Sequence, residues 1–257
     1  MRRRLRSARL KGSIYLLPNM FTTLNLFCGF YAVIASISGN FSAAAVSIII
    51  AGVFDSLDGK LARATNTTST FGVEYDSLAD VISFGMAPAV MVYLWALVPL
   101  GRIGWLAGFL FMACGALRLA RFNTQVGTVS SDHFVGLPIP AGAGMVATSV
   151  MLFEKFSIGG NLRPVLILIM LYLLSYLMVS SIKYSSFKKP ELFIKMNFNS
   201  LVVAILILIF VASQPAIALF VGGILYVGSG PAAALLRYRR IHQRKAEKNK
   251  DQPSTTA

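Results

Sequence analysis

The chain has 257 residues, of which 56% are hydrophobic and only 13% are charged. A soluble domain of this size would carry about 25% charged residues, so the composition excludes an ordinary soluble protein and indicates a single integral membrane domain. The net charge of +14 also occurs in nucleic-acid-binding proteins. Here, however, the basic residues gather at expected helix ends, where they face anionic lipid headgroups, so we expect no nucleic acid partner.

The apolar segments predict an all-α, polytopic membrane bundle, because about 20 apolar residues are enough to cross the hydrocarbon. We expect eight spans, at residues 19–38, 41–64, 73–98, 103–122, 137–156, 162–182, 198–213 and 215–236. Residues 1–14 would form a basic cytoplasmic segment and residues 15–236 the membrane-embedded catalytic domain. Residues 237–257 would form a basic cytoplasmic tail, helical at first and then disordered. Gln214-Pro215 predicts a tight turn, because proline disfavours helix in the residue before it.

The distribution of basic residues predicts the orientation. With eight spans and a cytoplasmic N-terminus, 21 Lys and Arg residues face the cytoplasm, and only Arg102, Lys155 and Arg163 lie outside. Cytoplasmic loops of membrane proteins carry this excess of Lys and Arg. The sequence therefore predicts that both termini are cytoplasmic. We also expect the protein to lie in the cell's inner membrane.

Four aspartates interrupt the second and third expected spans. Each costs about 2.5 to 3.5 kcal/mol to place at the centre of a membrane helix, so the group needs a compensating cation or a water-filled cavity. In sequence they read Asp-x-x-Asp-Gly-x-x-Ala-Arg, then eight residues, then Gly-x-x-x-Asp-x-x-x-Asp. The acids are Asp55, Asp58, Asp76 and Asp80.

On a helix, residues three and four apart share a face. The acids of each span therefore form a stripe, and the short connection between the spans brings the two stripes together. Carboxylates without nearby His or Cys suit Mg²⁺, Mn²⁺ or Ca²⁺ rather than zinc. We expect two divalent cations, Mg²⁺ or Mn²⁺, and chemistry on phosphorus.

The other residues of the pattern suit a phosphate ligand. Gly59 and Gly72 have no side chain and let a ligand or a facing helix approach. Arg63 can hold a diphosphate with paired donors. Ser69 offers a hydroxyl contact, or is simply a solvated loop serine. Judged by charge alone, the acids could also line the pathway of a cation or proton-coupled transporter.

The complete pattern from Asp55 to Asp80 resembles the signature of the CDP-alcohol phosphotransferases. The resemblance implies a homodimeric membrane enzyme that transfers a phosphatidyl group from a CDP-linked lipid to an alcohol and releases CMP. It assigns Asp55, Asp58 and Asp76 as metal ligands, and Asp80 as both a ligand and the proton acceptor. The active site would face the cytoplasm.

Segments 17–25, 83–89, 118–123 and 134–141 resemble the serine-using branch of that family. This implies CDP-diacylglycerol and L-serine as substrates, with membrane lipids around the protein. A sister enzyme that uses glycerol phosphate or an inositol phosphate stays open. The resemblance places Pro18, Asn19 and Thr22 near the cytidine or its diphosphate, although Pro-Asn at a helix start is ordinarily a cap. Arg118 and Arg121 could hold the serine carboxylate. Alternatively, they are simply part of the excess of basic residues at cytoplasmic helix ends, which sets the membrane orientation.

Overall fold

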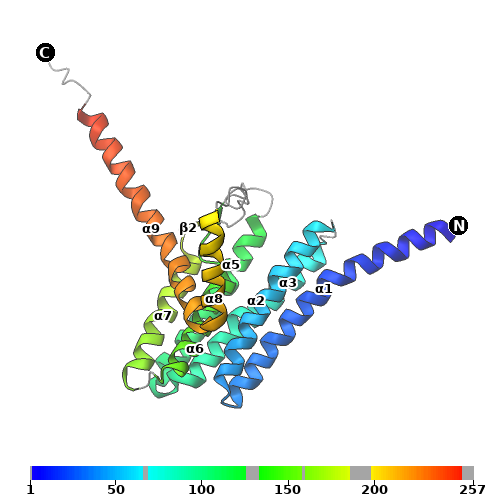
Figure 1. Cartoon of the computed structure of the whole chain (residues 1–257), viewed down its shortest axis with the longest axis horizontal. Coiled ribbons are helices and arrows are strands. Elements are labelled where there is room, and N and C mark those ends of the chain that lie inside the picture. Colours follow the sequence, from blue (N-terminus) through cyan, green and yellow to red (C-terminus); the bar gives the residue numbers. More distant parts are fainter. Residues whose placement is uncertain (1, 66–68, 126–132, 158–159, 186–197, 251–257) are drawn as a thin grey trace.

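The computed structural model describes residues 2–65, 69–125, 133–157, 160–185 and 198–250. The described residues are almost entirely helical, and their helices form one bundle (Figure 1). The α-helices are α1 (Arg2–Ile37), α2 (Phe41–Ala64), α3 (Thr70–Asp80), α4 (Ala87–Val92), α5 (Arg102–Gln125), α6 (Ile139–Lys155), α7 (Leu162–Val179), α8 (Phe198–Ser213) and α9 (Pro215–Lys250). The other elements are the π-helices η1 (Val81–Met86) and η2 (Tyr93–Leu97), the 3₁₀ turn η3 (Val98–Leu100), and the strands β1 (His133–Val135) and β2 (Lys183–Ser185).

Six helical segments of the described chain are long and apolar enough to cross a membrane, as expected of a multi-pass membrane protein. They include the continuous third span from Thr70 to Leu100. Two further predicted spans correspond to α6 and α8, which are helices of only 17 and 16 residues. The count of eight spans and the orientation of the termini therefore stay predictions.

The first helix begins earlier than expected. It runs from Arg2 and contains Pro18 in its interior, so the interpretation of Pro18-Asn19 as a helix cap, one of two that the sequence left open, was wrong. The preceding residues are rich in Arg and Leu, which are good helix formers and carry the helix up to the proline. The Thr22 hydroxyl donates to the Pro18 carbonyl at 3.3 Å. The last helix also continues beyond the expected span end, to Lys250.

Two short strands depart from the all-α prediction. β1 and β2 pair antiparallel, with Phe134 opposite Tyr184. The pairing continues into Gly136, whose N–H donates to the Ile182 carbonyl at 2.8 Å. Gly136 has a φ of +80°, a left-handed backbone conformation that glycine adopts more readily than other residues. The small sheet joins the chain after α5 to the chain after α7.

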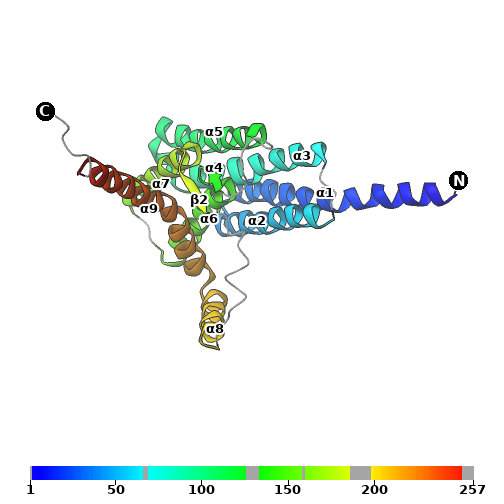
Figure 2. The ribbon, with the colours of Figure 1, turned by 90° about the horizontal axis from the view of Figure 1, so that it is seen from above.

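Small residues form the seam between α1 and α2. Ala32, Ala44 and Ala51 are fully buried there, and the Ser47 hydroxyl donates to the Cys28 carbonyl at 2.8 Å. Small side chains let membrane helices approach closely. α6 packs against α2 and α9, and α5 packs against α7. In Figure 2, α8 projects away from the other helices, and its main contact is with α9.

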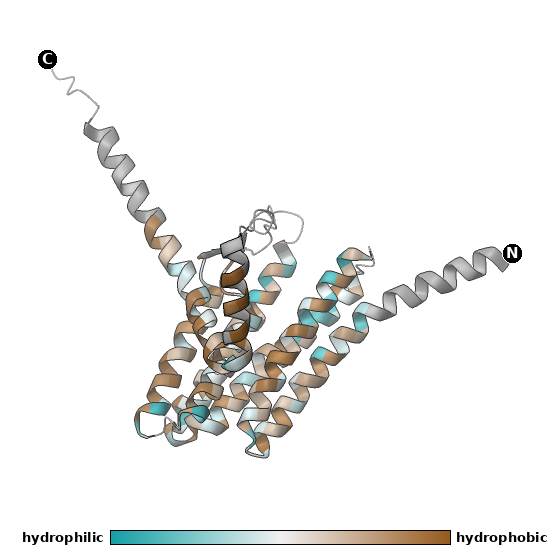
Figure 3. Ribbon diagram, in the orientation of Figure 1, coloured by the Kyte–Doolittle hydropathy of each residue, from teal (hydrophilic) through white to brown (hydrophobic). Residues whose placement is uncertain are grey.

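Hydrophobic residues fill the middle of the helices, and hydrophilic residues gather toward their ends (Figure 3). At one end, Trp95 of η2 donates from Nε1 to the Glu154 carboxylate of α6 at 2.9 Å. The Arg163 guanidinium of α7 lies 4.8 Å from the centre of the Trp95 ring, a favourable cation–π arrangement. These contacts fix α6 and α7 to the third span at the end far from the aspartates.

Candidate active site

Three of the four predicted acids converge in space. One carboxylate oxygen from each of Asp55, Asp76 and Asp80 lies within 4.8 Å of the other two. Asp55 comes from α2, and the other two come from α3, one helical turn apart. The i, i+4 spacing on α3 places its two acids on one face, which is turned toward α2. The two acidic stripes therefore meet as the sequence predicted.

Asp58 lies beside this group and has its own partner. It is buried, with 4% of its surface exposed, and its Oδ2 accepts the Thr22 hydroxyl at 3.0 Å. Asp58 also interacts electrostatically with Asp55 and Asp76. α1 thus contributes a hydroxyl that orients one acid of α2.

The acid cluster fits a divalent cation by its donor atoms. Asp76 Oδ1 is buried without a hydrogen-bond partner, and the Asp55 side chain is in hydrogen-bonding contact with Asp80. Two carboxylates stay in such contact only when a cation or a proton lies between them. Oxygen ligands alone suit the hard cations Mg²⁺, Mn²⁺ and Ca²⁺. The arrangement can bind a cation and grip phosphate oxygens through it.

Asn25 of α1 is a site residue that the sequence analysis missed. It is fully buried, and its Nδ2 donates to Asp80 Oδ1 at 3.2 Å. Its backbone carbonyl accepts the Ser83 hydroxyl at 2.9 Å. The signal was present in the sequence, because Asn25 follows Thr22 by three residues and shares its face of the helix. A polar amide within an apolar span marks a partner inside the bundle.

Removing the Asn25 side chain should release the Asp80 carboxylate. We expect Asn25→Ala to lower kcat about 10- to 100-fold, the usual effect of losing a group that orients a site carboxylate. The KM for the lipid substrate should change little. Ser38→Ala is the control, because Ser38 is exposed just after the end of α1 and its hydroxyl donates to the nearby Ile34 carbonyl. An unchanged kcat in Asn25→Ala would contradict the orienting role.

A close contact between α1 and η1 holds Asn25 in place. A Cβ on Gly29 would lie 2.7 Å from the Ser83 Cα atom, so only glycine fits there. Asp80 is the residue immediately before the π-helix η1. π-helical turns are rare and often occur at functional sites. The π-helical turn and Gly29 together determine the position of Asp80 along the axis of α1.

The predicted glycines differ in what surrounds them. A Cβ on Gly72 would meet Ser69 Oγ at 3.1 Å and Asn19 Oδ1 at 3.4 Å, so this glycine permits the approach of α1 to α3. A Cβ on Gly59 would meet only the Arg63 guanidinium, at 3.8 Å. The packing of the described chain therefore does not require glycine at position 59. Its small size leaves room beside Arg63, which is exposed.

Ser69 is not a solvated loop serine, because it has a structural role. Its hydroxyl accepts the Gly72 N–H at 3.0 Å and caps the start of α3. Asn19 lies within α1 and faces Gly72. Pro18 and Thr22 lie on the same helix, one turn apart. The residues predicted to bind the nucleotide thus gather where α1, α2 and α3 meet the acids.

The two predicted carboxylate-binding arginines occupy different environments. Arg118 of α5 is 8% exposed, its Nε is buried without a hydrogen-bond partner, and it interacts electrostatically with Asp80. Arg121 donates from Nη1 to the Val179 carbonyl at 3.2 Å, at the end of α7. Its Nη2 is buried and has no partner. Arg118 is therefore buried within electrostatic reach of Asp80, whereas Arg121 holds α5 against α7.

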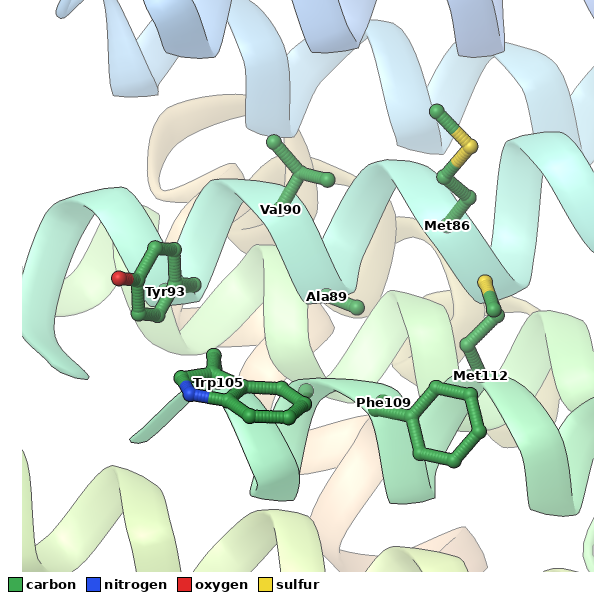
Figure 4. A pocket seen from close by; sticks show the side chains of 8 residues that line it. Met86, Ala89, Val90, Tyr93, Trp105, Phe109 and Met112 are labelled. Atoms are coloured by element: carbon green, nitrogen blue, oxygen red, sulfur yellow. The ribbon is translucent and has the colours of Figure 1, made fainter. Parts of the chain in front are cut away.

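An apolar groove of about 240 Å³ lies between the third span and α5, apart from the acids. Figure 4 shows the side chains of both elements that face it. No charged residue lines the groove, so it is not the place of chemistry on a phosphate. Its lining residues are Met86, Ala89, Val90, Tyr93, Trp105, Gly108, Phe109 and Met112.

Comparison with known proteins agrees with this geometry. A CDP-diacylglycerol–serine O-phosphatidyltransferase of Helicobacter pylori is 42% identical over 216 residues, which cover 84% of this chain and 90% of the relative. A protein of the same name from Bacillus subtilis is 37% identical over 67% of this chain and 92% of its own length. An archaetidylserine synthase of Methanothermobacter thermautotrophicus is 38% identical over 67% of this chain and 70% of its own.

The sequence profile of the CDP-alcohol phosphatidyltransferases matches residues 15–178, more than half of the chain. The matched region contains α2, α3 and all four aspartates. The resemblance noted in the sequence is confirmed: the chain belongs to the CDP-alcohol phosphatidyltransferase family.

Proposed function

We propose that this protein transfers the phosphatidyl group of CDP-diacylglycerol to the hydroxyl of L-serine, giving phosphatidylserine and CMP. The convergence of oxygens from Asp55, Asp76 and Asp80 carries the proposal, because it supplies the charge that binds a diphosphate through cations. The names of the three relatives above support serine as the acceptor.

The four acids Asp55, Asp58, Asp76 and Asp80 would hold two divalent cations, Mg²⁺ or Mn²⁺. When bound, these cations neutralise the diphosphate oxygens and the charge that develops on the departing CMP. Pro18, Asn19 and Thr22 of α1 would border the nucleotide, together with Gly59, Gly72 and Ser69. Arg63 would hold the diphosphate with paired donors.

Asp80 would take the proton of the serine hydroxyl. The serine oxygen forms a bond to the phosphorus that carries diacylglycerol, and the bond from that phosphorus to the CMP oxygen breaks. Asn25 donates to Asp80 Oδ1 and so orients the carboxylate that would accept this proton. A serine hydroxyl is a poor nucleophile near neutral pH, so a base in hydrogen-bonding reach accelerates its attack. Arg118 would bind the serine carboxylate, with Arg121 further along α5.

The proposed setting is the inner membrane, with eight spans, both termini cytoplasmic and the acid cluster near the cytoplasmic face. The excess of basic residues on one side of the predicted topology supports this. The outer ends of α1 and α9 also lie on the same side of the bundle as the start of α3 (Figure 1). We further propose a homodimer surrounded by membrane lipids.

The test is an acceptor panel. Purified protein with CDP-diacylglycerol and Mg²⁺ or Mn²⁺ should release CMP with L-serine, and much less with glycerol 3-phosphate or an inositol phosphate. Removing divalent cations with a chelator should abolish CMP release, and restoring Mn²⁺ or Mg²⁺ should recover it, because the clustered carboxylates then regain their counter-charge. CMP release with a phosphorylated acceptor alone would replace serine in the proposal. Absence of CMP with every acceptor, with cation flux into vesicles, would favour transport.

A further inference from the structure

A tyrosine from the last helix is an electrostatic partner of Arg118. Tyr226 of α9 interacts electrostatically with Arg118, which interacts with Asp80 in turn. Arg118 is nine-tenths buried, and its Nε has no hydrogen-bond partner. A buried guanidinium with an unused donor is a site for an anion. The phenol of Tyr226 can add one hydrogen bond to that anion.

Tyr184 of β2 fixes the position of this part of α9. It is fully buried, and its hydroxyl donates to the Val227 carbonyl at 3.2 Å. Its ring centre lies 5.7 Å from that of Tyr226. Burial, and then Tyr226, raises the pKa of Tyr184 to about 12, so its phenol stays a neutral donor at physiological pH. The small sheet therefore holds the backbone next to Tyr226.

A glycine makes this contact possible. A Cβ on Gly230 would overlap the Tyr184 ring, whereas a Cβ on Gly228, two residues earlier, would meet nothing within 4 Å. α9 can therefore approach β2 closely only with glycine at position 230. The two glycines form a matched pair for testing the contact.

The tyrosines lie outside the region that matches the family profile. That match ends at residue 178 and contains all four aspartates and Arg118. In the proposed reaction the acids act on the phosphatidyl donor, and this role is the same whichever acceptor is used. A group that recognises the acceptor has no need to lie in the same region, and the tyrosine that interacts electrostatically with Arg118 comes from beyond it.

We propose that Arg118 and Tyr226 together form the carboxylate site for an amino acid acceptor, so that α9 confers acceptor selectivity. This rests on the proposed transfer to serine and adds the residue that recognises the acceptor. The carboxylate accepts hydrogen bonds from the guanidinium and from the Tyr226 hydroxyl. The serine hydroxyl at the other end of this short molecule then faces Asp80.

The first test is Tyr226→Phe, which removes only the hydroxyl. The KM for L-serine should rise about tenfold, the usual effect of losing one hydrogen bond to a charged group. The kcat and the KM for CDP-diacylglycerol should stay within twofold of the wild-type values. Tyr176→Phe is the matched control, because Tyr176 of α7 is 70% exposed, and it should change neither KM.

The second test moves α9 without altering Tyr226. Gly230→Ala should raise the KM for L-serine, since the added methyl group pushes α9 away from Tyr184. Gly228→Ala should leave that KM unchanged. An equal response of the two alanine variants would overturn the role of the contact.

The outcomes separate this inference from the proposed function. If wild-type protein releases CMP with serine and Tyr226→Phe keeps a wild-type KM for serine, the carboxylate site is refuted while the reaction stands. If Tyr226→Phe instead raises the KM for CDP-diacylglycerol, Tyr226 contacts that substrate rather than serine. This result would also refute the carboxylate site. If wild-type protein releases no CMP with serine, the proposed function itself fails.

Discussion

Asp80→Asn should lower kcat about 1,000-fold or more while CDP-diacylglycerol still binds. A general base contributes about 10² to 10⁴ in rate, and the amide cannot take the serine proton. Asparagine keeps the shape of aspartate and a carbonyl oxygen that can accept from Asn25, so the packing around position 80 should survive. CMP release measures the rate, and the rise in Tm on adding CDP-diacylglycerol measures binding.

Glu74→Gln is the control for this variant. Glu74 is an exposed acid on the same helix as Asp80 and lies outside the converging group. It should keep wild-type activity. Near-normal turnover in Asp80→Asn would remove Asp80 from the role of base and shift the search to another acid of the cluster. Loss of lipid binding together with turnover would make Asp80 primarily a cation ligand.

Gly29→Ala should lower both stability and activity, although alanine is ordinarily the better helix former by about 0.5 to 1 kcal/mol. The new Cβ would lie 2.7 Å from the Ser83 Cα atom, which is backbone and can yield only if η1 moves. Overpacking of this kind costs about 1 to 3 kcal/mol. A shift of η1 also moves Asp80, and a misplacement of about 1 Å can lower a rate about 100-fold.

Thermal unfolding in detergent and CMP release together measure this effect. Gly144→Ala in α6 is the control, because a Cβ there meets nothing within 4 Å. It should keep the wild-type Tm or raise it slightly. If Gly29→Ala matched Gly144→Ala in both Tm and kcat, the contact between α1 and η1 would not be what positions Asp80.

The sequence was most informative where helical spacing alone decides the geometry. The separations of three between Asp55 and Asp58, and of four between Asp76 and Asp80, place each pair on one face. The short connection then leaves the two helices little freedom except to lie antiparallel. For this reason the meeting of the acids could be predicted.

What the sequence could not provide is the register between helices that are distant in the chain. Asn25 meets Asp80 across 55 residues, and Tyr184 meets Val227 across 43. Nothing in the local pattern of either partner specifies the other. The contact of Gly29 with Ser83 depends likewise on how far α1 slides along η1. These contacts follow from the packed bundle rather than from periodicity.

Two local interpretations failed because competing local rules were stronger. Asn19 was interpreted as either a helix cap or a ligand, and the cap interpretation failed because the helix-forming residues before it extend α1 back to Arg2. Ser69 was interpreted as either a ligand or a solvated loop serine, and the loop interpretation failed because its hydroxyl caps the N–H of Gly72, three residues later. In both cases the polar side chain was recognised and its structural task was not.

The π-helix η1 also determines where the rest of the third span faces. Each π turn contains an additional residue, so the residues after Met86 are rotated by about 100° compared with an uninterrupted α-helix. Asp76 and Asp80 can therefore point at α2 while Ala87 and Met91, further along the same rod, are completely buried in the apolar core. One continuous span therefore contributes to both the polar acid cluster and the apolar core. The length of its π-helical turn determines the orientation of the acids as much as their spacing in the sequence does.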